Sequence, residues 1–346
     1  MIWPAGKLGR KNDRCINDAG WRNISRELKR GELTPGPYGP GRVSPLFVII
    51  LLVGEKVKGW YNLGMPELPE VETIRRGLKG CILNKKVKGV EVECEKSFIG
   101  EKEEIIGAKI VETSRKGKAL IINLDNGKSI LIHLRMTGQL IYVDEQTRFA
   151  GGHPNENFVA ELPNKQTRVV IDFSTAKLFF NDQRKFGFMK VMKTDEVNED
   201  KFIASLGKEP WEMGDDEFYE KLQRHARAPI KAVILDQKVI AGLGNIYADE
   251  ALFRVGIHPS RLAGEVSREE SGELLMAARA VMEKSIEAGG STLQNYVKAD
   301  GTRGDYLEKF AQVFHREGQK CFKCGAEIVK IRVAGRGTHI CPRCQK

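Results

Sequence analysis

The spacing of apolar residues predicts a helix soon after Met65. Residues 69–78 place a proline and acidic residues in a first turn, followed by Ile74 and Leu78 on one helical face. Gly80 lies past the expected end, where glycine commonly closes a helix. The chain therefore changes at Met65 from irregular to patterned sequence.

Between residues 82 and 195, short apolar runs alternate with turn residues, which predicts an antiparallel sheet. Ala119–Leu124 and Ser129–Leu134 are separated by a turn that contains Asn126 and Gly127. An Asn-Gly pair between apolar runs strongly indicates a hairpin. We expect a β-sandwich covered by the first helix. The other expected strands are Val87–Glu93, Gln139–Val143, Arg168–Phe173 and Lys177–Phe180.

After residue 200 the apolar period lengthens to that of helices. The longest such stretch places Leu274, Ala278, Val281 and Ile286 roughly on one face. A β half followed by an α half predicts two domains with a cleft between them. The expected helices are Asp215–Arg224, Pro229–Gln237, Asn245–Val255 and Ser267–Ala288.

Charge is unevenly distributed along the 346 residues, whose formal net charge is +10. Residues 1–64 hold 11 Lys/Arg and 5 Asp/Glu, and residues 309–346 hold 9 and 2. A basic C-terminal end favours a module that contacts phosphate, and a solvated charged surface is the alternative.

The first 64 residues are rich in Gly, Pro and Arg and show no sustained period, which indicates disorder or a mis-assigned start. The longest apolar run, Leu46–Val53, falls well short of the roughly 20 residues that a membrane helix needs. We therefore expect a cytoplasmic protein with no membrane partner.

Four cysteines near the C-terminus form two CxxC pairs separated by 16 residues. Four thiolates at this spacing match the closed tetrahedral coordination of one structural Zn²⁺, which is not expected to be catalytic. Glu327–Arg332 and Gly337–Ile340 can pair as the hairpin of a zinc ribbon. Chance spacing, redox thiols and an iron–sulfur cluster are the alternatives. The expected ligands are Cys321, Cys324, Cys341 and Cys344; Cys15, Cys81 and Cys94 are expected to be inert.

The stretch Pro66–Thr73, directly after a methionine, resembles the start of the formamidopyrimidine-DNA glycosylase family. The resemblance covers residues 65–346 in the family's order, and nothing before Met65 belongs to it. The other segments that carry it, besides the zinc segment, are Ser114–Lys118, His133–Gly138, Asn181–Gly187, Leu206–Pro210 and Ala241–Ala248.

The resemblance implies an α+β multidomain protein that binds damaged double-stranded DNA. Its fold would be an N-terminal helix plus an antiparallel β-sandwich, a helical helix–two-turn–helix domain and a C-terminal zinc ribbon. The implied domains are a non-family extension at 1–64, a catalytic sandwich at 65–197, a helical DNA-binding domain at 198–306 and the zinc ribbon at 307–346.

The implied activity is excision of oxidised purines, such as 8-oxoguanine and formamidopyrimidines, followed by β,δ-elimination. If the chain began at Pro66, that residue would carry a free amine, and α-amino groups have a pKa of about 8. Such an amine can attack a sugar C1′, expel the base and leave a Schiff base. By resemblance, Glu67 is the acid, Lys118 assists elimination at the phosphate, and Arg336 serves later proton transfer. Without the family, Pro-Glu here is merely a helix start.

An enzyme that reaches a base inside a duplex must extrude the base and fill the gap. Met136, Arg184 and Phe186 match the family's gap-filling residues, and Arg184 would reach the opposite base, preferably cytosine. Taken alone, Met136 and Phe186 would be core residues.

A glycine-rich turn before residue 245 suits phosphate, because it exposes backbone N–H groups. Asn245 and Lys231 match the family's residues that hold the DNA backbone around the lesion, and Arg227 lies on the approach, on the same expected helix as Lys231. Tyr296–Tyr306 resembles the mobile loop that covers the extruded base.

Two departures from the family pattern affect DNA contacts. Gln166 and Arg168 stand where the family usually has two histidines, and Arg168 could still hold a phosphate. Lys185 replaces an arginine that commonly precedes the aromatic residue, which preserves the charge.

With residues 1–64 attached, the nitrogen of Pro66 belongs to a tertiary amide and cannot attack. A misplaced start, proteolytic maturation and a lyase-dead DNA-binding protein are the three interpretations. The rival functions are an endonuclease VIII-like enzyme for oxidised pyrimidines and a non-catalytic damage-binding module. The stretch after Glu67 and the long 296–306 loop favour the purine branch. We expect a monomer.

Overall fold

The computed structural model describes residues 65–153, 155–291 and 306–346. The expectations for residues 1–64 and for all but the last residue of the Tyr296–Tyr306 loop lie outside the described residues. Within the described parts of the chain, no helix is long and apolar enough to cross a membrane.

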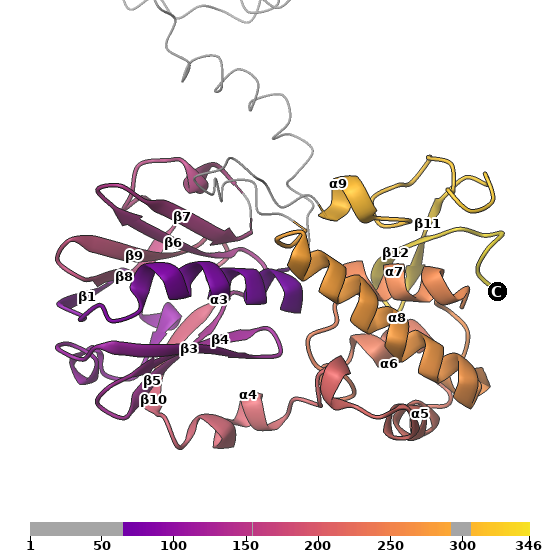
Figure 1. The fold of residues 1–346 in the computed structure, drawn as a ribbon, viewed down its shortest axis with the longest axis horizontal. Helices are drawn as coiled ribbons and strands as arrows, with labels where there is room; N and C mark the ends of the chain where they lie inside the picture. The colour runs from indigo at the N-terminus through magenta and orange to yellow at the C-terminus, as the bar shows by residue number, and fades with distance from the viewer. Residues whose placement is uncertain (1–64, 154, 292–305) are drawn as a thin grey trace, which may run out of the picture. The chain divides into compact units, whose positions relative to one another are not determined.

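Two five-stranded sheets form the first half of the described chain, as expected for a sandwich (Figure 1). Neighbouring strands are antiparallel except β2 and β10, which run parallel. In sheet order, the first sheet comprises β1 (Gly89–Val92), β8 (Thr167–Asp172), β9 (Ala176–Asp182), β6 (Gly138–Asp144) and β7 (Arg148–Gly152). The second comprises β2 (Phe98–Ile99), β10 (Phe188–Lys193), β5 (Lys128–His133), β4 (Ala119–Leu124) and β3 (Ile110–Lys116).

The expected hairpin joins β4 to β5, with Asn123 opposite Ser129 and Gly127 at a φ of +76°. That left-handed conformation favours glycine. Strands β2, β3, β7 and β10 were not expected from the pattern. Strand β2 has two residues, polar residues interrupt β3 and β10, and β7 ends in small residues, so none of the four shows a clean alternation.

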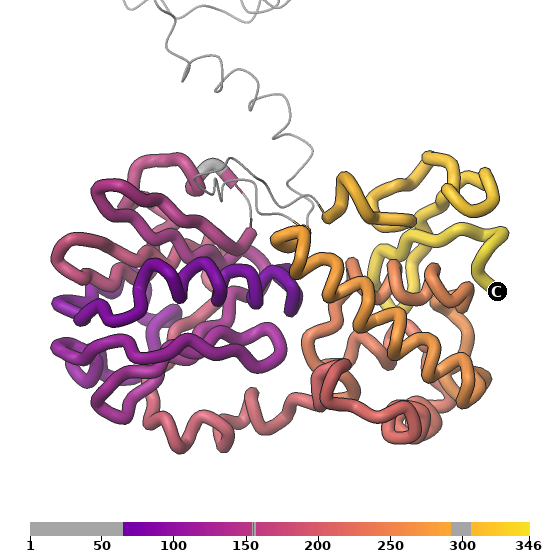
Figure 2. The backbone as a smooth tube through the Cα atoms, viewed as in Figure 1, coloured from indigo at the N-terminus to yellow at the C-terminus, as the bar shows by residue number. Residues whose placement is uncertain are grey.

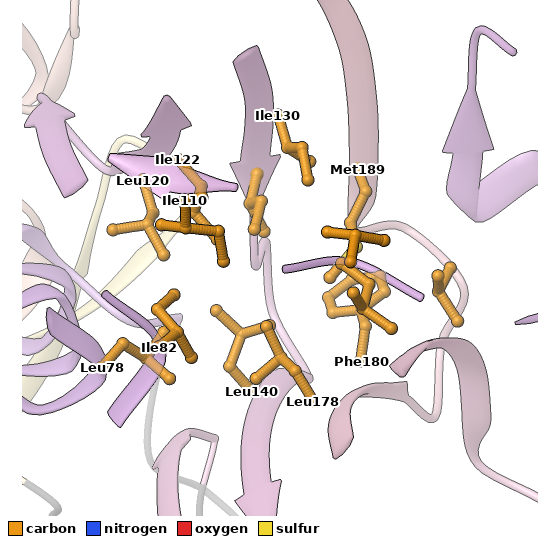
Figure 3. Packing of buried hydrophobic residues seen from close by; sticks show 14 of the residues in the cluster. Leu78, Ile82, Ile110, Leu120, Ile122, Ile130, Leu140, Leu178, Phe180 and Met189 are labelled. Atoms are coloured by element: carbon orange, nitrogen blue, oxygen red, sulfur yellow. The ribbon is translucent and has the colours of Figure 1, made fainter. Parts of the chain in front are cut away.

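Helix α3 (Leu68–Ile82) packs against both sheets. Its residues Leu78 and Ile82 face Leu120 and Ile122 of one sheet and Leu140 of the other in a continuous apolar core (Figure 3). The expected end before Gly80 is wrong, because the helix continues to Ile82. The buried Ile82 gains more from packing than Gly80 costs in helix propensity.

The second half of the chain is helical and has its own core. Figure 2 follows the backbone from β10 through α4 and α5 into these helices. The side chain of Ser267 accepts a hydrogen bond from the N–H of Glu270 and caps α8, whereas Gly256, at a φ of +79°, closes α7. The helices are α4 (Lys201–Ala204), α5 (Asp215–Gln223), α6 (Ile230–Leu235), α7 (Asn245–Val255), α8 (Arg268–Glu287) and α9 (Tyr306–Phe310).

A two-stranded ribbon ends the chain. Strands β11 (Val329–Val333) and β12 (Arg336–Ile340) pair antiparallel around a turn of Ala334 and Gly335, both left-handed. The expected hairpin is present, and its first strand begins two residues later and ends one residue later than expected. A small core of Val313, Ile328, cysteines and Phe253 of α7 lies beneath it.

The close approach of α3 to β7 gives a prediction about stability. A Cβ on Gly77 would collide with the ring of Phe149, whereas a Cβ on Gly80 meets nothing within 4 Å. We expect Gly77→Ala to lower the free energy of unfolding by about 1–3 kcal/mol through overpacking. The matched control Gly80→Ala should raise it by about 0.5–1 kcal/mol. Urea denaturation measures both, and equal effects would contradict the packing described.

Candidate active site

The N-terminus of α3 lies directly on the glycine-rich turn that precedes α7. The N–H of Leu68 donates to the carbonyl of Gly242 at 3.2 Å, and the N–H of Ile246 donates to Oε1 of Glu67 at 3.0 Å. A Cβ on Gly242 would collide with Leu68, and one on Gly244 would collide with the Glu67 carboxyl group. The glycines therefore permit a contact between segments nearly 180 residues apart in sequence.

Glu67 is 3% exposed and immediately follows the buried Pro66. Burial raises the pKa of Glu67 to about 7, with a further raising effect from Glu70, whereas Lys118 and backbone N–H groups of α7 lower it. Its Oε2 atom has no hydrogen-bond partner among the described residues. A buried carboxyl group with a pKa near neutrality and one open oxygen can give or take a proton.

Lys118 lies between β3 and β4 and is 7% exposed. Burial lowers the pKa of this ammonium, Glu67 and Glu70 oppose the shift, and Arg336 adds to it. The turn is held by Glu209, which accepts from the N–H of Gly117 at 2.8 Å. The structure thus places two other sequence-predicted residues, Glu67 and Arg336, within electrostatic range of Lys118.

Arg115 strengthens the hold on this turn. Its guanidinium nitrogens donate to the two oxygens of Glu209 at 2.6 and 3.0 Å, and its Nε donates to Glu72 at 3.3 Å. Such a bidentate pair is directional. The strand end before Lys118 is therefore tied both to α3 and to the segment that begins the helical half.

The exposed Arg336 begins β12, and a fully buried ion pair holds that strand to the helices. Lys231 donates to Asp249 at 2.5 Å and to Thr338 Oγ1 at 2.7 Å, and the second oxygen of Asp249 accepts from the N–H of His339 at 2.8 Å. Asn245 donates from Nδ2 to the carbonyl of Gly337 at 3.1 Å.

Lys231 and Asn245, expected at the DNA backbone, therefore both bind the zinc hairpin. Lys231 is 0% exposed and its ammonium already has protein partners. Asn245 is partly exposed, and its Oδ1 has no partner among the described residues. Arg227, expected on the same helix as Lys231, lies outside it, because α6 begins at Ile230; its side chain is exposed.

Three expected gap-filling residues are brought together on the surface. Met136 is 40% exposed, Phe186 is 60% exposed, and Nη1 of the exposed Arg184 lies 3.2 Å from Sδ of Met136. The interpretation of Met136 and Phe186 as core residues is therefore wrong. Large apolar side chains held at the surface are suited to insertion between bases.

Asp182, which the sequence reasoning missed, organises this surface. It is fully buried, and its carboxylate accepts hydrogen bonds from the backbone N–H groups of Arg184, Phe186 and Gly187 and from the hydroxyl of Thr137. An aspartate just before a turn is a recognisable signal, because its side chain often binds N–H groups that follow.

Arg168 and Gln166 are both largely buried. Arg168 donates from Nε to the carbonyl of Asp182 at 2.8 Å and from Nη1 to that of Lys165 at 3.0 Å. Oε1 of Gln166 accepts from Nδ2 of Asn157 at 2.8 Å. Both side chains hold neighbouring loops. Few N–H groups of Arg168 therefore remain free to contact a phosphate.

The four predicted metal ligands converge. Their Sγ atoms all lie within 4.8 Å of one another, with 3.9 Å between Cys321 and Cys344 and 3.4 Å between Cys324 and Cys341. Sulfur atoms about 2.3 Å from a tetrahedral Zn²⁺ are separated by about 3.8 Å. The cluster therefore fits one structural zinc ion, which would hold the ribbon but supply no chemistry to the reacting sugar.

Comparison with known proteins identifies the architecture as that of a DNA glycosylase. Three family models match in chain order: the formamidopyrimidine-DNA glycosylase N-terminal domain at residues 65–189, the formamidopyrimidine-DNA glycosylase H2TH domain at 206–297, and the zinc finger found in FPG and IleRS at 318–346.

Relatives and solved structures agree with these matches. The chain is 42% identical over 289 residues to the formamidopyrimidine-DNA glycosylase of Pelotomaculum thermopropionicum, covering 82% of this chain and 99% of that protein. It is 39% identical to the one from Desulfitobacterium hafniense, covering 81% and 100%. A Lactococcus lactis FPG mutant bound to Fapy-dG-containing DNA matches with a TM-score of 0.71 and 34% identity, covering 81% of this chain and all of that one.

The chain therefore belongs to the formamidopyrimidine-DNA glycosylase family. It is a DNA-binding glycosylase of base-excision repair with one structural zinc site.

Removal of zinc tests the link between the ribbon and DNA binding. The segment is too short to fold without its metal, so Cys341→Ser or a chelator should unfold the hairpin that carries Arg336. We expect affinity for duplex DNA to fall by about tenfold or more, because phosphate contacts are lost. Zinc content and fluorescence anisotropy measure this loss. Cys94→Ser, outside the cluster, should change neither, and undiminished DNA affinity without zinc would contradict the assignment.

Proposed function

We propose that the chain excises oxidised purines from duplex DNA with the amine of Pro66 as nucleophile, and then breaks the strand by β,δ-elimination. One observation carries the proposal. Glu67, next to Pro66, is buried against the N-terminus of α7; its Oε1 accepts a hydrogen bond from Ile246, and its Oε2 has no partner among the described residues. An acid with a pKa of about 7 lies next to the proposed nucleophile.

The first steps follow from these groups. The unprotonated nitrogen of Pro66 donates its lone pair to C1′, and the bond from C1′ to the damaged base breaks, with the electron pair leaving on the base, which takes up a proton. The nitrogen loses its own proton. The C1′–O4′ bond then opens to form the Schiff base, and O4′ takes a proton from Glu67.

The Schiff base makes strand cleavage possible. It acidifies C2′, and loss of a proton there lets the 3′ phosphate leave; loss of a proton from C4′ lets the 5′ phosphate leave in turn. Lys118 and Arg336 are the cationic side chains assigned to these phosphates. Lys118 interacts electrostatically with both Glu67 and Arg336, which supports the assignment of the pair to this reaction.

Access to a base inside the duplex is assigned to the surface of Met136, Arg184 and Phe186. An exposed ring and thioether can occupy the space left by the extruded nucleotide, and a guanidinium can bind the opposite base. The oxidised-purine substrate is supported by two related structures, one with Fapy-dG-containing DNA and one, named MutM, with carbocyclic 8-oxo-G-containing DNA.

The chemistry requires Pro66 to begin the active polypeptide. In the printed sequence its nitrogen is joined to Met65 and has no lone pair available for attack. We propose that the active form is a monomer that starts at Pro66, through an internal start with methionine removal or through proteolysis.

Borohydride trapping tests the nucleophile. A chain that starts at Pro66 should become covalently attached to DNA containing 8-oxoguanine, because borohydride reduces a Schiff base to a stable amine. The matched control is the full chain retaining Met1, which should bind DNA without being trapped, and Pro66→Gly should trap at least about tenfold less. Equal trapping by the intact full chain, verified by mass spectrometry, would assign the nucleophile elsewhere and overturn the proposal.

Lesion preference separates the two enzyme functions. We expect duplexes with 8-oxoguanine opposite cytosine to be cut at least about tenfold faster than duplexes with thymine glycol, because the stretch after Glu67 and the long 296–306 loop favour the purine branch. Single-turnover rates with equal enzyme give the comparison. Faster cutting of thymine glycol would favour the endonuclease VIII-like alternative, and DNA binding without cutting of either would favour a non-catalytic module.

A further inference from the structure

Glu70, in the first turn of α3, is a buried carboxylate surrounded by hydrogen-bond donors. It is 3% exposed, and Oε1 accepts from Tyr247 Oη at 2.6 Å and from the N–H and hydroxyl of Ser291 at 2.8 and 2.7 Å. Oε2 accepts from the N–H of Glu67 at 2.9 Å. Four donors directed at an acceptor-only group are the environment of an ionised carboxylate.

The bond from Glu67 acts close to the proposed nucleophile. The nitrogen that donates to Glu70 is bonded to the carbonyl carbon of Pro66, so the hydrogen bond sets the plane of the peptide that joins Pro66 and Glu67. The side chain of Glu67 is held at its other end by the N–H of Ile246. Backbone and carboxyl group are therefore fixed by different partners.

The donors to Glu70 come from three separate segments. Tyr247 belongs to α7, Ser291 follows α8, and Glu67 precedes α3. Ser285 of α8 lies 2.5 Å from the oxygen of Tyr247, so this hydroxyl can accept from Ser285 while it donates to Glu70. A chain of hydrogen bonds thus extends from α8 to the peptide beside Pro66.

Glu70 also contributes to the electrostatics of Glu67. Its charge raises the pKa of Glu67, in the same direction as burial, whereas Lys118 lowers it. Lys231 of α6 and Tyr247 of α7 also interact electrostatically with Glu67. Glu70 is the acidic side chain among these groups, so removal of its charge lowers the pKa of Glu67.

We propose that Glu70 is a positioning residue for the excision reaction, held by Tyr247 and Ser291 so that it fixes the peptide between Pro66 and Glu67 for attack on C1′. This inference rests on the proposed function. In addition, the negative charge of Glu70 adds to the effect of burial in raising the pKa of Glu67, which favours the protonated form of that acid. Glu70 contacts neither sugar nor base and acts through Pro66 and Glu67.

The test compares Glu70→Gln with a matched buried carboxylate elsewhere. Glu250 is 2% exposed and accepts three backbone N–H groups, from Gln312, Val313 and Phe314. Glu250→Gln should therefore destabilise the fold without acting on the peptide beside Pro66. Tyr247→Phe removes one donor to Glu70 and keeps the ring, which provides a milder second variant.

All variants start at Pro66 and are assayed under single turnover with saturating 8-oxoguanine duplex from pH 5 to 9. We expect Glu70→Gln to slow base release by about tenfold or more at saturation, with DNA affinity changed by less than about threefold. On the alkaline side of the pH profile, the midpoint of the loss of activity should occur about one pH unit lower. The reason is that Glu67 loses a neighbouring negative charge, which lowers its pKa. Tyr247→Phe should shift the midpoint less, in the same direction.

The outcomes separate the two claims. The positioning role would be overturned if Glu70→Gln kept the wild-type rate at saturation and the wild-type pH profile. It would also be overturned if Glu250→Gln shifted the pH profile as much as Glu70→Gln. Either result would leave the proposed function intact. If Glu70→Gln does not fold, an unchanged rate and pH profile in Tyr247→Phe overturns the positioning role. If the parent chain itself forms no trapped adduct, the proposed function fails, and the role of Glu70 fails with it.

Discussion

The contact between Glu67 and the N-terminus of α7 is the constraint on which the site depends. A buried carboxyl group must find hydrogen-bond donors, and here the donor is the N–H of Ile246 at 3.0 Å. The contact requires glycine at positions 242 and 244, where a Cβ atom would collide with Leu68 and with the Glu67 carboxyl group, respectively. The contact thereby joins the β-sandwich to the helical half at the atoms proposed to do the chemistry. The packing that brings these two halves together therefore also assembles the site.

Much of the fold follows from local pattern. The hairpin at Gly127, α7 and the four-cysteine cluster were all predicted from short segments with strong signals. The pattern missed β2, β3, β7 and β10, because a two-residue strand or a strand with polar residues or glycines gives no clean alternation. The order of strands in each sheet could not be predicted, since it depends on contacts between segments distant in the sequence.

Individual site residues were predicted less completely than the motifs that contain them. Resemblance singled out Arg184, Phe186 and Arg336, but it could not indicate that Asp182 holds the turn of the first two and that Asp249 holds the strand of the third. Carboxylates that bind backbone N–H groups have no distinctive spacing, because their partners are set by tertiary packing. Lys231 is the clearest case: its motif predicted a DNA contact, but the motif gave no sign of the buried ion pair with Asp249.

The complete burial of Lys231 and Asp249 has a consequence for behaviour in salt. Dissolved ions screen charges that water reaches, such as the exposed Arg336, with a Debye length of about 8 Å at physiological ionic strength. Ions do not penetrate to a pair whose side chains are both 0% exposed. Raising the salt concentration therefore weakens the attraction between exposed cations and DNA phosphates, while the Lys231–Asp249 ion pair beneath the zinc hairpin is not screened. The protein can release a duplex and keep its binding surface assembled for the next one.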